Sequence, residues 1–308
     1  MLPILFAILP IFLVILVGYV SVRRNLLSTA FWAEADRLIF YLLFPALLLG
    51  SIAEAPLQDL TLLPLALATV VSLLLMTFAL LATRRWISRD GPSFTSLFQG
   101  AIRQNSYLCF AVALALKGTV GVEAVAIGVA IYVPLINMIT IVVLLRYGAN
   151  SGQGFGRIVV AVFKNPLMLS ILIGLALNVS GIGLHGAISQ VLSILGQAAL
   201  CLGLMAVGAG LDLDAARRSG RLVGLAILLK MAVLPTIALS FALLFAVDSQ
   251  ATFALVLLAG SPTAGAAYIM ARQMGGNAPL VAAIITAQVA ISLVSLPLWL
   301  GLLERLGQ

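Results

Sequence analysis

The chain has 308 residues, of which 63% are hydrophobic and only 9% are charged, and its formal net charge is +7. A soluble domain carries roughly 25% charged residues, so this chain has too little polar surface to face water on all sides. We therefore predict an all-α integral membrane protein with the lipid bilayer as its surroundings. The positive charge does not indicate a nucleic-acid partner, because the basic residues lie in short loops between apolar runs.

Apolar segments of membrane-spanning length follow one another along the chain. A helix needs about 20 such residues to cross a bilayer, and ten segments fit. The predicted spans cover residues 3–22, 34–53, 61–83, 92–117, 121–145, 166–181, 187–211, 221–247, 250–273 and 278–303. The first has no positively charged start and no small-residue cleavage site, so we interpret it as a retained span and not as a signal peptide.

The distribution of basic residues predicts the orientation of these spans. The predicted outer side holds Lys117 and Arg305, whereas the inner loops and inner helix ends hold Arg23, Arg24, Arg37, Arg84, Arg85, Arg89, Arg146, Arg157, Lys164, Arg217, Arg218, Arg221 and Arg272. Cytoplasmic loops are enriched in lysine and arginine. Both termini are therefore predicted on the non-cytoplasmic side, and the protein is predicted in a bacterial inner (plasma) membrane.

The least apolar stretch, residues 146–165, divides the chain into two halves of five spans each, 1–145 and 166–308. Because five is odd, the second half must enter the membrane with the opposite orientation to the first. This arrangement predicts two inverted five-helix repeats joined by a cytoplasmic linker.

The fourth span contains a polar cluster in its middle, Arg103-Gln104-Asn105-Ser106-Tyr107. A charge at the bilayer centre costs about 2.5–3.5 kcal/mol on insertion scales, so these side chains should face the protein interior or a wet cavity. The ninth span has its own breaker, Gly260-Ser261-Pro262-Thr263-Ala264-Gly265. Proline removes a helical hydrogen bond and clashes with the preceding turn. We therefore predict broken, crossing fourth and ninth helices, with new half-helices beginning near Ser106 and near Thr263.

Paired interruptions in corresponding spans indicate the binding site of a transporter. The free N–H groups of two half-helices favour an anion, Arg103 adds a guanidinium suited to carboxylate, and the carbonyl ends of the preceding half-helices suit a cation such as sodium. The predicted substrate-binding residues are Arg103, Gln104, Asn105, Ser106, Tyr107, Ser261, Pro262 and Thr263. The predicted cavity-lining residues are Asn137, Lys230, Tyr268 and Gln288. Each polar residue has a plainer interpretation, as a contact between helices.

Other kinds of chemistry find no support in the sequence. No acidic residue lies deep within a predicted span, which argues against a relay of buried carboxylates, and no catalytic triad or metal-ligand spacing is present. We therefore predict a protein that is not an enzyme and has no cofactor or metal, and coupling to Na⁺ or H⁺ stays open.

The two interruptions resemble those of the auxin efflux carrier family, which includes plant auxin exporters and bacterial permeases for malonate or malate. The plant proteins carry Asn-Pro-Asn-Thr-Tyr at the first crossover, where this chain has Asn105 and Tyr107 in matching places and Gln104 in place of the proline. The second crossover is similar in Ser261-Pro262-Thr263-Ala264, with Tyr268, Ala271 and Arg272 beyond it. The resemblance implies an elevator mechanism, a homodimer, anionic substrates and a substrate contact at Asn105.

These observations together predict a secondary transporter of small organic anions, either dicarboxylates or monocarboxylates. Two alternatives stay open. A sodium-coupled organic anion symporter of the bile-acid type has a similar ten-helix plan, and a membrane sensor would bind a ligand without moving it.

Overall fold

The computed structural model describes residues 2–55, 62–149, 166–217 and 220–307, and within these ranges the chain forms helices and no strands. The elements are α1 (Leu2–Arg23), α2 (Thr29–Leu38), the π-helical turn η1 (Ile39–Leu43), α3 (Phe44–Ala53), α4 (Leu62–Ala82), α5 (Arg84–Ile87), α6 (Gly91–Ile102), α7 (Ser106–Tyr147), α9 (Pro166–Val179), α10 (Gly186–Ala209), α11 (Leu213–Arg217), α12 (Arg221–Leu228), the π-helical turn η2 (Leu229–Val233), α13 (Leu234–Leu244), α14 (Ser249–Gly260), α15 (Ala266–Met274) and α16 (Ala278–Arg305). The all-α prediction is confirmed.

Long apolar helices dominate the structure. In the described part of the chain, 7 helices are long and apolar enough to cross a membrane, and α9 and α14 are shorter apolar helices. The longest of the 7 stretches, Gly91–Tyr147, includes both α6 and α7, and α7 itself is non-helical at Gly118, with φ 62° and ψ −146°. That residue separates the fourth from the fifth predicted span. The number of ten spans and their inverted repetition stay predictions, and most of the predicted linker lies outside the described residues.

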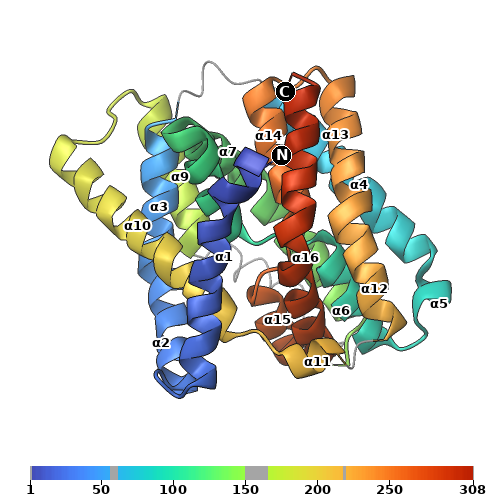
Figure 1. The fold of residues 1–308 in the computed structure, drawn as a ribbon. Coiled ribbons are helices and arrows are strands. Elements are labelled where there is room, and N and C mark those ends of the chain that lie inside the picture. Colours follow the sequence, from blue (N-terminus) through green and yellow to red (C-terminus); the bar gives the residue numbers. More distant parts are fainter. Residues whose placement is uncertain (1, 56–61, 150–165, 218–219, 308) are drawn as a thin grey trace.

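The helices form two groups, which lie on the left and right of Figure 1, except that α7 of the second group reaches across to the left beside α9. We call α1, α2, η1, α3, α9 and α10 the scaffold group, in which α1 packs against α10 and α3 packs against α9 and α10. The crossover group contains α4–α7 and α11–α16, in which α14 packs against α7 and α13, and α16 packs against α6. Each group therefore takes helices from both predicted repeats. The two chain ends lie at the same end of the molecule (Figure 1).

In the scaffold group, α1 and α10 meet backbone to backbone. A Cβ atom added at Gly18 would lie 1.9 Å from the carbonyl oxygen of Met205, and one added at Gly208 would lie 1.8 Å from the carbonyl oxygen of Ile15. Small residues at a crossing allow this close approach and the dense packing that holds membrane helices together. The α1–α10 pair is therefore a rigid part of the scaffold group.

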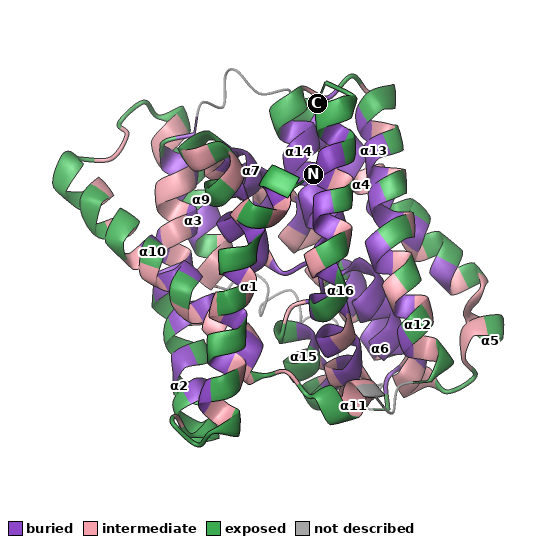
Figure 2. Ribbon diagram, viewed as in Figure 1, coloured by how far each residue is buried: buried purple, intermediate pink, exposed green. Residues whose placement is uncertain are grey.

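The two short helices before the interruptions are the most buried elements of the crossover group. Every residue from Phe94 to Ile102 on α6 and from Ala251 to Gly260 on α14 is buried, as the purple colour of these helices shows (Figure 2). Both helices end inside the protein, so their terminal carbonyl groups need partners from the protein itself. The crossover group thus supplies a closed, low-dielectric surrounding for the interruptions.

Candidate functional site

The first interruption lies where the polar cluster predicted it. Helix α6 ends at Ile102, Arg103 has an extended backbone (φ −77°, ψ 146°), and α7 begins at Ser106. Asn105 caps the new helix, since its Oδ1 accepts a hydrogen bond from the backbone N–H of Leu108 at 3.2 Å. Arg103, Gln104 and Asn105 are all buried, so the polar cluster faces protein and not lipid.

The second interruption is longer than the sequence predicted. Helix α14 ends at Gly260, but α15 begins at Ala266, so the predicted helix start near Thr263 is wrong by three residues. Thr263 uses its own polar groups for other contacts: its backbone N–H donates to Oε1 of Gln288 at 2.9 Å, and its hydroxyl donates to the carbonyl oxygen of Gly100 at 3.2 Å. These bonds hold the segment in a non-helical path, in which Pro262 is also buried.

The two interruptions touch one another. The backbone N–H of Asn105 donates to the hydroxyl of Ser261 at 3.3 Å, and that hydroxyl donates to the carbonyl oxygen of Leu258 at 3.0 Å. Gln288, on α16, adds a bridge by donating to the carbonyl oxygens of Gly100 at 2.7 Å and Ala226 at 3.1 Å. The structure therefore brings the predicted residues Asn105, Ser261, Thr263 and Gln288 together at one crossing.

Arg103 is a nearly buried cation, with 8% of its surface exposed. Its guanidinium donates to Oδ1 of Asn137 at 3.0 Å and lies 3.1 Å from the sulfur of Met270. Among the described residues, no acidic side chain forms an ion pair with it. A buried charge without a counter-ion costs several kcal/mol, so Arg103 is suited to an anionic ligand.

Lys230 is fully buried in η2, and its ammonium group donates to the carbonyl oxygen of Leu258 at 3.2 Å, near the end of α14. Tyr132 caps the end of α6 in the same way, because its hydroxyl donates to the carbonyl oxygen of Ile102 at 2.9 Å. The carbonyl ends that the sequence suggested for a cation thus already have donors from this chain. Lys230 and Gln288 contact the protein backbone.

Three predicted residues reach partly accessible positions. Ser106 and Tyr107 are half-buried, and Tyr268 is 37% exposed. The ring of Tyr107 lies 4.8 Å, centroid to centroid, from the ring of Phe44 in the scaffold group. It also covers Gly203 of α10, where an added Cβ would be 2.8 Å from the ring. Tyr107 is therefore the part of the first interruption that meets the scaffold group.

The sequence analysis did not select two buried polar residues that lie near the crossing, Gln99 and Thr140. Both side-chain polar atoms of Gln99 and the hydroxyl of Thr140 are buried and have no hydrogen-bond partner among the described residues. The side-chain N–H₂ of Asn105 is unpartnered in the same way. Gln99 lies one helical turn before Arg103, and Thr140 lies one turn after Asn137. Polar residues spaced three or four apart share a helix face, and this spacing was the signal that could have found them.

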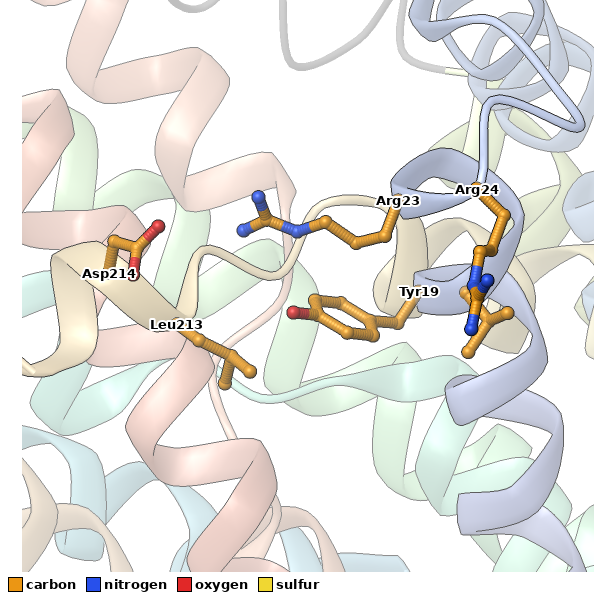
Figure 3. A pocket seen from close by; sticks show the side chains of 6 residues that line it. Tyr19, Arg23, Arg24, Leu213 and Asp214 are labelled. Carbon is orange, nitrogen blue, oxygen red and sulfur yellow. The ribbon is translucent and has the colours of Figure 1, made fainter.

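A cavity of about 360 Å³ lies away from the crossing, between the end of α1 and α11. Tyr19 and Arg23 extend toward Leu213 and Asp214 across it, whereas Arg24 points away (Figure 3). A neighbouring cavity of about 510 Å³ shares Tyr19, Arg23 and Asp214 and adds Asp212. None of the predicted site residues lines these two cavities, and the two together are lined by two arginines and two aspartates.

Comparison with known proteins shows that the chain is similar to membrane transport proteins. A family model described as membrane transport protein matches residues 156–300. The chain is also 26% identical, over 295 residues, to a protein of Methanothermobacter thermautotrophicus described as an uncharacterized transporter, and the match covers 95% of this chain and 96% of that relative. The family match confirms over its range the resemblance expected from the sequence. The chain is thus a multi-pass membrane protein that is similar to membrane transport proteins, and this similarity supports transport over enzymatic catalysis.

Proposed function

We propose that the protein is a secondary transporter of small organic anions, which binds mono- or dicarboxylates at the crossing of the two interruptions. The main supporting observation is the contact between Asn105 and Ser261 at 3.3 Å, which joins the start of α7 to the end of α14. The backbone N–H groups of Ser106, Tyr107, Gly265 and Ala266 have no hydrogen-bond partner among the described residues, and all four residues are at least partly accessible.

The electrostatics of the crossing favour an anion. Each half-helix start carries about half a positive charge, and Arg103 adds a full one. The side-chain N–H₂ of Asn105 is a further buried donor without a partner among the described residues. Residues 91–117 and 249–274, which contain both interruptions, include no aspartate or glutamate. A carboxylate at this place would meet donors and positive charge, with no nearby acidic group from either broken helix to repel it.

The helix pairing supports inverted repeats and an elevator movement as parts of the proposal. If the predicted repeats are exchanged, α1 corresponds to α9 and α3 corresponds to α10. The contact of α1 with α10 then becomes the contact of α9 with α3, and both contacts are extensive. The crossover group would slide past the scaffold group, with Tyr107 at the boundary between them.

Lys230 bears on the coupling ion. A sodium ion near the end of α14 would compete with the ammonium group for the carbonyl oxygen of Leu258, and the two positive charges would repel each other. We therefore propose sodium-independent transport, which disfavours the bile-acid type of symport. No contact in the structure favours a sensor that binds a ligand without transporting it.

We also propose the homodimer that the family resemblance implies. The mass of the purified protein in nanodiscs tests this proposal.

Uptake of labelled malonate or malate into proteoliposomes, with and without sodium, tests the proposal. Wild type should take up the label in a saturable way, and Arg103→Ala should lose most of the uptake because the buried cation is gone. Arg37→Gln is the matched control, because Arg37 is exposed and already paired with Glu34 at 3.2 Å. Equal uptake by wild type and Arg103→Ala would remove Arg103 from the mechanism. Saturable binding without uptake would replace the transporter by a sensor.

A further inference from the structure

The short helix α5 stands out from the crossover group at the right-hand edge of Figure 1, in the half of the molecule away from the chain termini. It follows α4 directly and is joined to α6 by Ser88, Arg89 and Asp90. Trp86 on α5 has 77% of its surface exposed, which is unusual for so large an apolar side chain. Tryptophan prefers the boundary between the hydrocarbon and the headgroups of a membrane, so this placement indicates contact with that boundary.

The three arginines of this segment have two different roles. Arg84 faces inward, where its guanidinium carbon lies 4.3 Å from the centre of the Tyr147 ring and 5.7 Å from that of Phe94. Cation–π contacts of this kind fasten α5 to α6 and α7. Arg85 and Arg89 are exposed, and neither forms an ion pair with an acidic side chain of the described residues.

The neighbouring acid, Asp90, forms no ion pair with either arginine within the described part of the chain. Asp90 caps α6, because its Oδ2 accepts a hydrogen bond from the backbone N–H of Ser93 at 2.9 Å. Two guanidinium groups next to an exposed indole therefore offer donors for a phosphodiester and an apolar surface for the chain attached to it. Guanidinium binds phosphate oxygens in a two-pronged fashion. The positive-inside orientation places the segment at the cytoplasmic leaflet.

We propose that Arg85, Trp86 and Arg89 form a binding site for the headgroup of an anionic phospholipid in the cytoplasmic leaflet. The lipid phosphate would lie between the two exposed arginines, with Trp86 at the level of the glycerol backbone. Since α5 connects α4 and α6, the bound lipid would hold the cytoplasmic end of the crossover group at the membrane surface.

Thermal unfolding in nanodiscs tests this site without any measurement of transport. Phosphatidylglycerol mixed into phosphatidylcholine should raise the unfolding midpoint of wild type, whereas inorganic phosphate in phosphatidylcholine alone should not. Arg85→Gln/Arg89→Gln should lose at least half of the rise, and Arg37→Gln, an exposed arginine of the same leaflet already paired with Glu34, should keep it. An equal rise in the double variant would overturn the proposal, and so would an equal effect of inorganic phosphate.

Tryptophan quenching locates the lipid. Phosphatidylglycerol brominated near the carbonyl end of its chains should quench the fluorescence of Trp86 more than brominated phosphatidylcholine does. The contribution of Trp86 is obtained by subtracting the signal of Trp86→Phe, which retains the buried Trp32 and the partly buried Trp299. The difference between the two lipids should disappear in Arg85→Gln/Arg89→Gln. Equal quenching by both lipids in wild type would show that no anionic headgroup is selected there.

Discussion

Gln288 is the residue that joins most parts of the crossing. It accepts from the N–H of Thr263 and donates to the carbonyl oxygens of Gly100 and Ala226, so it connects α16 with the second interruption, α6 and α12. From the sequence, Gln288 was a candidate for the cavity wall. A polar side chain in mid-span looks the same in a sequence whether it faces a ligand or another helix, and only the structure separates the two.

The loss of stability should increase with the number of these hydrogen bonds that a substitution removes. Thr263→Val removes the hydrogen bond from the threonine hydroxyl to the carbonyl oxygen of Gly100. That carbonyl still accepts a hydrogen bond from Gln288, so the variant should lose only about 1 kcal/mol of stability. Gln288→Leu leaves the buried N–H of Thr263 without its acceptor and removes two further bonds, so its cost should be about 2–4 kcal/mol. Denaturant unfolding in detergent measures both values. A larger loss for Thr263→Val than for Gln288→Leu would contradict this account of the crossing.

At the scale of elements, the interruptions were predictable and their lengths were not. An arginine in an apolar run and a Gly-Ser-Pro-Thr sequence both conflict with a continuous helix, so the breaks could be found from local chemistry. The start of α15 depends on Thr263 contacting Gln288 and Gly100, which lie far away in the chain. The close packing of α1 on α10 likewise depends on glycines from opposite halves of the chain.

That packing predicts a strong effect of single methyl groups. Gly18→Ala or Gly208→Ala would place a Cβ less than 2 Å from a carbonyl oxygen of the partner helix, so the helices must move apart. We expect a clear drop in the thermal unfolding midpoint for each variant. Gly224→Ala on α12 is the control, because an added Cβ there meets no atom within 4 Å, and alanine in a helix gains up to about 1 kcal/mol over glycine. Equal midpoints for all three variants would refute a backbone contact between α1 and α10.

For the whole molecule, the division into two groups could not be derived from the sequence, since each group mixes helices from both halves of the chain. Periodicity and hydropathy describe one span at a time, and they do not say which spans become neighbours. The boundary between the groups is marked by Tyr107, which lies against Phe44 and Gly203. An elevator movement requires this boundary to slip during each transport cycle.

A disulfide across the boundary tests that movement. In a background with Cys109→Ser and Cys201→Ser, the pair Tyr107→Cys/Gly203→Cys should cross-link, since an added Cβ at Gly203 lies 2.8 Å from Cγ of Tyr107. Oxidation should stop anion uptake by this variant and reduction should restore it. The pair Gly50→Cys/Leu192→Cys, with Cβ atoms 3.4 Å apart inside the scaffold group, should transport equally in both states. Uptake by the oxidised boundary pair at its reduced rate would exclude sliding at this contact.

The segment after α10 limits how far such sliding can go. Helix α10 ends at Ala209 in the scaffold group, and only Gly210 and Leu211 separate it from Asp212, whose N–H donates to the hydroxyl of Thr286 on α16 at 2.9 Å. A chain extends by at most about 3.6 Å per residue, so Asp212 must stay within about 11 Å of Ala209, and Thr286 stays beside it while their bond is intact. In the proposed elevator movement, a larger separation of α10 from α16 requires the bond between Asp212 and Thr286 to break, so this bond would limit the travel of the crossover group.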